Sequence, residues 1–170
     1  MTDASFSRMG SLPAGPPDAP AVVAFLTRSL GYRYRWATDG MAEETLAFRP
    51  VEGSMDMAEL MGHLCDLAWW MRLTLTGAMA PRPEPGVEGL RAATMAHLEV
   101  VADAFAAMTP AELEALRISP PGTEEEFPLS NVIHGPLADF LTHVGQVTSW
   151  RRIAGDLAPA APVFFGGPPA

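Results

Sequence analysis

The chain has 170 residues, a length that fits one domain, and its 48% apolar and 18% charged residues are typical of a globular protein rather than a disordered acidic chain. It contains 11 Arg, no Lys and 20 acidic residues, which give a formal charge of −9. Because nucleic acids and anionic membranes both call for a basic protein face, this balance argues against either as a partner.

The single cysteine, Cys65, excludes an internal disulfide and a CxxC zinc module, and it favours a reducing, cytoplasmic location. We expect neither a transmembrane helix nor a signal peptide, because no apolar run approaches ~20 residues and residues 1–10 lack a basic region followed by an apolar stretch. Pro and Gly gather near both ends, and we predict flexible tails at residues 1–17 and 157–170 around one body at residues 18–156.

Between the tails the pattern predicts helices and not strands, since alternating apolar and polar runs are absent and β-branched residues are few. The first predicted helix begins at Asp18, a suitable N-cap, with Pro20 in its first turn. It runs to about Glu44, and the segment stops before Pro50 because the residue preceding a proline avoids the helical region.

The second and third predicted helices have clear start signals. Asp56 and Glu59 have the spacing of a capping box, and the helix that they open runs to Gly77. The third helix covers residues 87–108 with its apolar side chains on one face. Thr109, followed by a proline, then predicts the N-cap of a short extra helix.

Residues 119–127 are expected to form a loop before the fourth long helix. That helix begins at about Ser130 or Pro136 and runs to Ile153, with Gly155 as its C-terminal stop. The proline must lie in the first turn or kink the helix. Four long amphipathic helices favour an all-α four-helix bundle, a scaffold whose function depends on the polar groups that it carries.

Two polar side chains of the fourth helix have the spacing of a shared metal site. Asp139 precedes His143 by four residues, and side chains at that spacing lie on one helix face with Cβ atoms about 5–6 Å apart. A third ligand from another helix would complete a face of three ligands with open positions, and His63 of the second helix is the best candidate. The same spacing is also that of an ordinary surface ion pair, so it leaves both interpretations open.

Residues 135–146 read GPLADFLTHVGQ, and Arg151 and Arg152 follow before a glycine. This stretch resembles the last long helix of the DinB/YfiT-like family of metal-binding four-helix bundles, whose pattern is HxxxHxGQ with a trailing Arg near a Gly. Residues 54–63, which end on a histidine, are similar to the family's second-helix patch, and the Leu-x-Phe-Arg-Pro stretch is similar to its turn between the first two helices. Asp139 stands where the family has its first His.

The resemblance implies an antiparallel four-helix bundle of the DinB/YfiT-like type, with a divalent metal ion held by His63, Asp139 and His143. Nickel or zinc is the metal that the family favours, and two imidazoles with one carboxylate also suit iron. We expect Arg151 and Arg152 to neutralise the C-terminal end of their helix.

Four further polar residues have more than one interpretation. Gln146 could orient a metal ligand or make a helix–helix hydrogen bond. Asp66 could be a fourth ligand or a general base, and we favour a surface carboxylate. His97 is expected to be a hydrogen-bonded histidine at the edge of the core rather than a ligand, and His134 to be structural or exposed. Trp70 is expected in the core or lining a cleft.

The favoured function is therefore a metal-dependent enzyme acting on a small molecule, either by thiol-dependent S-transfer or isomerisation or by hydrolysis, the two chemistries that the resemblance implies. The alternative is a non-catalytic binding or stress-response bundle with a structural or vestigial metal. A third interpretation is a structural dimer without metal, in which Asp139 and His143 form a surface pair. We expect a small-molecule substrate, with a low-molecular-weight thiol as one candidate partner, and a homodimer.

Overall fold

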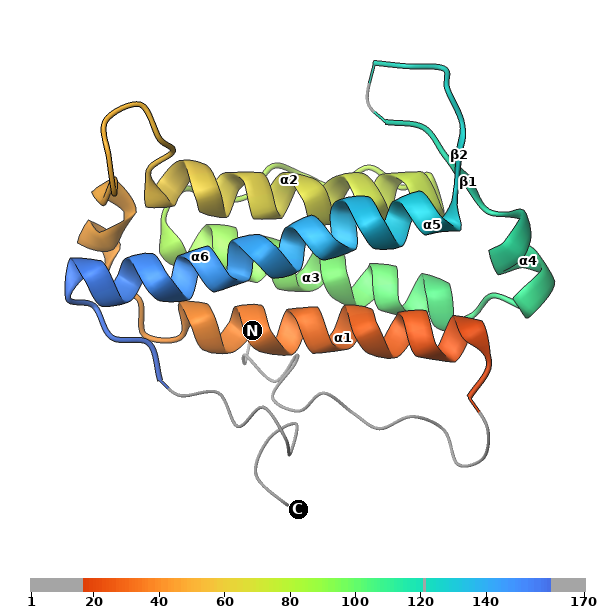
Figure 1. The fold of residues 1–170 in the computed structure, drawn as a ribbon, viewed down its shortest axis with the longest axis horizontal. Coiled ribbons are helices and arrows are strands. Elements are labelled where there is room, and N and C mark those ends of the chain that lie inside the picture. Colours follow the sequence, from red (N-terminus) through yellow and green to blue (C-terminus); the bar gives the residue numbers. More distant parts are fainter. Residues whose placement is uncertain (1–16, 121, 160–170) are drawn as a thin grey trace.

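The computed structural model describes residues 17–120 and 122–159, and Figure 1 shows four long helices lying side by side. The expected tails, residues 1–17 and 157–170, lie almost wholly outside the described residues. The long helices are α1 (Ala19–Thr38), α2 (Met57–Thr76), α3 (Val87–Ala106) and α6 (Ala138–Ala154). The short elements are a 3-10 helix η1 (Glu43–Ala47), α4 (Pro110–Ala115), strands β1 (Arg117–Ile118) and β2 (Phe127–Pro128), α5 (Leu129–Val132) and a π-helical turn η2 (Ile133–Leu137).

The predicted all-α four-helix bundle is confirmed, and Figure 1 shows α1 and α6 running against α2 and α3. Because α2 and α3 run in the same direction, residues 77–86 must return along the full length of α2. A helix of 20 residues is about 30 Å long, and ten fully extended residues reach about 33–36 Å. The alternating Pro81, Pro83 and Pro85 suit this connection, since proline favours extended backbone.

The connection ends at a cap supplied by another part of the chain. Val87, the first residue of α3, donates its backbone N–H to the carboxylate of Glu43 at 3.0 Å, so an anion of η1 lies at the positive end of the α3 dipole. Gly86 has φ 92°, and a Cβ there would lie 2.7 Å from a Glu43 carboxylate oxygen. Glycine therefore permits both the backbone conformation and the close approach.

The predicted helix starts are confirmed by their hydrogen bonds. Asp18 accepts from the N–H of Ala21 at 2.9 Å, and Asp56 and Glu59 form a complete reciprocal capping box. Thr109 caps α4 in the same way. These signals lie within four residues of one another, which explains why the sequence alone reveals them.

Two boundaries differ from the prediction. The first helix ends at Thr38 rather than near Glu44, because Gly40 adopts a left-handed φ of 59°. Helical structure resumes only in the 3-10 helix η1. The expected loop at residues 119–127 is a hairpin loop, flanked by two antiparallel residue pairs in which Ile118 is opposite Phe127. Strands of two residues are too short to show a period in the sequence.

The last long segment is kinked at the proline, which the sequence allowed either to lie in the first turn of the helix or to kink it. Gly135 has ψ −105°, outside the helical range, and divides α5 from α6 within the π-helical turn. Pro136 follows it, and a proline inside a helix removes a donor and collides with the preceding turn. The kink places Asp139 in the first turn of α6.

The four long helices share one apolar core. Tyr34 of α1 and Phe140 of α6 contact each other with ring centroids 5.7 Å apart, and both are fully buried. The same core contains buried apolar side chains of α2 and α3, among them Leu60, Leu64, Leu98 and Phe105. Within the described residues no helix is both long and apolar enough to cross a membrane.

Arg151 differs from its expected role, because it serves the end of α1 rather than that of its own helix. Its side chain is 1% exposed and donates to the backbone carbonyls of Ala37 and Asp39, each at 2.9 Å. It also donates to Asp156 at 2.7 and 3.2 Å. The guanidinium therefore satisfies the carbonyl end of α1 from the neighbouring helix.

Candidate metal centre

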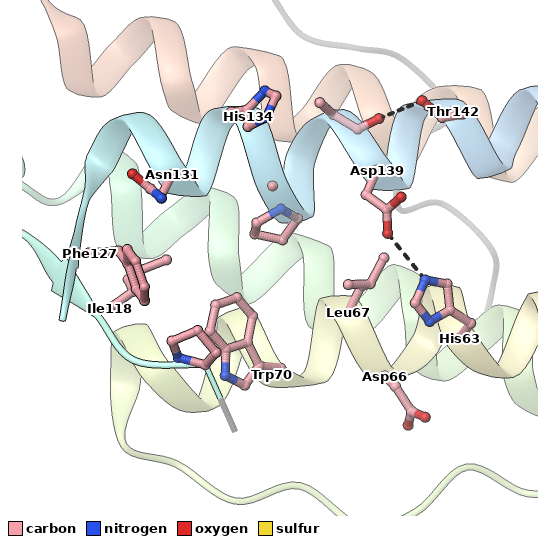
Figure 2. Close-up of a pocket in the computed structure, with 14 residues that line it drawn as sticks. His63, Asp66, Leu67, Trp70, Ile118, Phe127, Asn131, His134, Asp139 and Thr142 are labelled. Carbon is pink, nitrogen blue, oxygen red and sulfur yellow. Dashed lines mark hydrogen bonds and ion pairs between the residues drawn. The ribbon is translucent and has the colours of Figure 1, made fainter. Parts of the chain in front are cut away.

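The three predicted ligands come together where α2 faces α6. His63 lies in the second turn of α2, and Asp139 and His143 lie one turn apart near the start of α6. Figure 2 shows the Asp139 carboxylate extending from α6 toward the His63 ring. The capping box of α2 and the kink before α6 fix where these turns begin, and thereby align the three side chains.

The Asp139 carboxylate lies between the two imidazoles. One of its oxygens is 3.2 Å from His63 Nε2, and the other is 3.4 Å from His143 Nε2. The two rings are perpendicular, with centroids 4.8 Å apart. One nitrogen or oxygen from each of the three residues can be chosen so that all three atoms lie within 4.8 Å of one another.

Gln146 hydrogen-bonds the ring of His143. Its side-chain oxygen is 2.6 Å from His143 Nδ1, so with the amide in this orientation Nδ1 is the donor and carries the proton. In the neutral ring the lone pair is then on Nε2, which faces an Asp139 oxygen. Two acceptors facing each other repel unless a cation lies between them. The arrangement therefore calls for a proton or a metal ion at this point.

The donor set fits a divalent metal ion. Zinc bonds to histidine and carboxylate are about 2.0–2.2 Å long, so neighbouring ligands of a tetrahedral ion are about 3.3–3.6 Å apart. The distances from the two Asp139 oxygens to the two imidazoles, 3.2 and 3.4 Å, are close to this range, and one ligand atom from each residue lies within 4.8 Å of the others, so small side-chain shifts would bring the three onto one ion. Two imidazoles and one carboxylate suit zinc, nickel and iron alike, so the cluster could bind a metal ion whose identity the geometry leaves open.

The cluster is open to solvent on one side. The side chains of His63 and Asp139 are 34% and 45% exposed, and that of His143 is 17% exposed. Asp66 is exposed on the next turn of α2 and is not part of the group, for which the described residues supply three ligands. Three ligands and an accessible face are the arrangement of a metal site with open coordination positions.

A cavity of about 810 Å³ adjoins the cluster, and His63 and Asp139 form part of its wall. Figure 2 shows Leu67 and Trp70 on α2 and Ile118 and Phe127 on the hairpin strands around the same space. The two hairpin residues were not predicted from the sequence, because they flank a segment with the composition of a polar loop. The one local signal is that each is a single large apolar residue beside a run of Pro, Gly and Glu.

The other candidate residues lie outside the cluster. His97 is buried on α3, where burial and the nearby positive charge of Arg72 lower the pKa of its imidazole. Arg72 lies 3.3 Å from its Nδ1, and its Nε2 has no hydrogen-bond partner among the described residues. His134 is exposed and lines the cavity. Cys65 is buried, and burial raises the pKa of its thiol.

Four long helices, with a His/Asp/His cluster between the second and the last, define a bundle of the kind that carries metal ligands on facing helices. The chain is similar in structure to YjoA, a DinB-like protein from Bacillus subtilis, with a TM-score of 0.63, 14% identical residues, and coverage of 86% of this chain and 99% of that one. The expected DinB-like fold is therefore confirmed. A scan against protein-family models finds no match, and a search of curated proteins finds none either.

Proposed function

We propose that this protein is a metal-dependent enzyme that acts on a small molecule, with a divalent ion held by His63, Asp139 and His143. The observation that carries the proposal is that His63, Asp139 and His143 each offer one ligand atom within 4.8 Å of the others, beside a cavity large enough for a substrate. A structural ion is closed off by a fourth protein ligand, and the described residues bring three together.

The residues of the chain have distinct tasks in this proposal. Gln146 keeps the His143 lone pair directed at the cluster, and Asp139 offers one oxygen toward each imidazole. When bound, an ion there supplies Lewis acidity, which lowers the pKa of a coordinating water or thiol so that a nucleophile forms near neutral pH. Both chemistries, S-transfer or isomerisation with a thiol and hydrolysis with water, use that nucleophile. Nickel and zinc are the preferred metals, with iron third.

The test is elemental analysis of protein purified without a histidine tag. We expect one equivalent of metal in the wild type and its loss in His63→Ala, Asp139→Ala and His143→Ala, with circular dichroism unchanged. His134→Ala is the matched control, because that histidine lines the same cavity outside the cluster, and it should keep the metal. Full metal retention in two of the three ligand variants would contradict the proposal.

Activity distinguishes an enzyme from a binding bundle. The metal-loaded protein is tested against pairs of a low-molecular-weight thiol with an electrophile, and against esters and amides. Turnover that disappears in His143→Ala supports the enzyme. A bound metal that does not exchange with added chelator, without turnover, supports the non-catalytic bundle instead.

Two further expectations belong to the same proposal. The single cysteine is buried and free, which suits a reducing cytoplasm. We also propose a homodimer, and its mass in solution is measured by light scattering.

A further inference from the structure

The cavity beside the cluster has walls that are mostly apolar. Leu67 and Trp70 of α2 form one side, and Ile118 and Phe127 of the hairpin close the end. Trp70 and Phe127 are only partly buried, so their rings have area left for a ligand to cover. Covering such surface is favourable by about 25 cal/mol for each Å² removed from water, so the walls suit an apolar ligand body.

No arginine lines the cavity within residues 17–120 and 122–159, and the chain has no lysine at all. The ionisable side chains of the wall are His63, Asp66, His134 and Asp139, so its fixed charges are negative. The remaining polar groups are neutral: Asn131 offers an exposed amide, and the Thr142 hydroxyl already donates to a backbone carbonyl.

The hairpin adds further negative charge beside the end of the cavity. Three consecutive exposed residues, Glu124, Glu125 and Glu126, directly precede Phe127, which lines the wall. Figure 1 shows the hairpin projecting away from the bundle near the end of α2 and the start of α5. The hairpin strands also carry one exposed cation, Arg117, whose guanidinium donates to the backbone carbonyls of Glu114 and Leu116. An anionic group on a ligand at this end would meet three carboxylates for that one cation, and like charges repel.

We infer that the cavity selects a slender substrate with an apolar, preferably aromatic body, whose far end is uncharged or positively charged. The near end of the substrate lies at His63 and Asp139, so the inference rests on the proposed metal-dependent function. The charge preference of the far end rests separately on the glutamates of the hairpin. Substrates with a carboxylate or phosphate away from the reacting end are disfavoured.

Three synthetic probes test the inference, all 3-phenylpropanohydroxamic acids, which carry a metal-binding hydroxamate at one end. Their para substituents are hydroxymethyl, aminomethyl and carboxylate, so only the charge of the far end varies. Affinities for zinc-loaded protein are measured by calorimetry near pH 8, where histidine side chains are ordinarily neutral. We expect the carboxylate probe to bind at least about tenfold more weakly than the hydroxymethyl probe, and the aminomethyl probe at least as tightly as the hydroxymethyl probe.

Variants locate the two contributions. Trp70→Ala should weaken all three probes about tenfold, because it removes the largest apolar wall. Trp69→Ala is the matched control on the same helix, since Trp69 lines a different and smaller cavity, and it should leave the affinities unchanged. Glu126→Gln, which removes the hairpin charge next to Phe127, should tighten the carboxylate probe about threefold while the hydroxymethyl probe stays constant.

Zinc content measured on the same samples separates the two ways of failing. A protein that binds no zinc overturns the proposed function. A protein that binds one zinc but has equal affinity for the three probes overturns the inference and leaves the proposed function standing. If folded Trp70→Ala binds the probes as tightly as the wild type, the inference that the apolar wall binds the ligand is overturned. The probe series on the wild type tests the charge preference even if no variant folds.

Discussion

Two polar clusters lie on α6, one at each end, and they differ in how their hydrogen bonds are used. At the C-terminal end Arg151 is 1% exposed, and Asp156 accepts from it, from Thr45 and from the Ala42 N–H. At the N-terminal end Asp139 lies between two imidazoles and is 45% exposed. The first cluster is closed and paired, and the second is open.

The two clusters differ in how fully protein groups satisfy them. Arg151 makes four hydrogen bonds to protein acceptors, which tie α6 to the end of α1 and, through Asp156, to η1. Asp139 instead lies between the imidazoles of His63 and His143 with its side chain open to solvent, and this is where the proposed metal ion would bind.

The largest expected effect comes from breaking the closed cluster. Arg151→Ala removes the charged partner of the largely buried Asp156 carboxylate and the donor to two backbone carbonyls, and we expect it to lower the free energy of unfolding by about 3–5 kcal/mol. Urea unfolding measures the loss. Arg152→Ala, at the exposed neighbouring position, should change stability by less than about 0.5 kcal/mol. A loss below 1 kcal/mol in Arg151→Ala would be close to that of an ordinary surface substitution, and would show that the closed cluster does not stabilise the fold.

The open cluster should respond to metal rather than to packing. Zinc at about a hundred times its Kd should raise the free energy of unfolding of the wild type by about 2.7 kcal/mol, because it binds the folded state. His143→Ala should lose this gain, and Arg152→Ala should keep it. Thermal unfolding with and without zinc makes the comparison, and an equal gain in His143→Ala would place the metal elsewhere.

Gln146→Ala should weaken zinc binding about tenfold or more, since it removes the acceptor that holds the His143 proton on Nδ1. Gln146→Glu supplies another oxygen acceptor and should restore most of the affinity. Competition with a chromophoric chelator measures both variants. If Gln146→Ala and Gln146→Glu weaken zinc binding equally, the hydrogen bond from residue 146 does not orient His143.

The smallest effect concerns acid. Burial acts to raise the pKa of the Asp156 carboxyl, but hydrogen bonds from Arg151, Thr45 and the Ala42 N–H outweigh it and hold that pKa below its ordinary value of 3.8. The unfolded chain therefore takes up the proton first as the pH falls. The stabilisation is complete above pH 3.8 and disappears as the pH drops through the lowered folded-state value.

Asp156→Asn should accordingly be less stable than the wild type near neutral pH, with a difference that shrinks once the pH is below 3.8. Urea unfolding of both proteins over a series of pH values measures this difference. A difference that stays constant into that acid range would mean that the carboxylate contributes by shape and not by charge.

Local signals explain what the sequence predicted of this molecule. The caps at Asp18 and Asp56 and the Asp139–His143 pair each depend on residues three or four positions apart, so they are visible without tertiary knowledge. His63 lies 76 residues before Asp139, so no spacing links the two; it was the best candidate for a third ligand on another helix, and the resemblance then implied the same residue.

The features that escaped prediction all join distant segments. Asp156 meets Thr45 across 111 residues, and no periodicity encodes such a contact. Arg151 was assigned to its own helix because sequence offers no way to know which helix end its side chain reaches. The cavity wall at Ile118 and Phe127 is held by a hairpin with two paired residues in each strand, which is too short to show an alternating pattern in the sequence.

The π-helical turn at residues 133–137 also sets the rotational phase of everything that follows it. Each residue of a helix advances by about 100° around the axis, so a single insertion or deletion between Val132 and Ala138 would swing Asp139 and His143 by that angle, away from α2. Lengthening the connection at residues 77–86 would carry no such penalty. Among natural variants of this chain, length changes should therefore accumulate in the proline-rich return and be rejected at the kink.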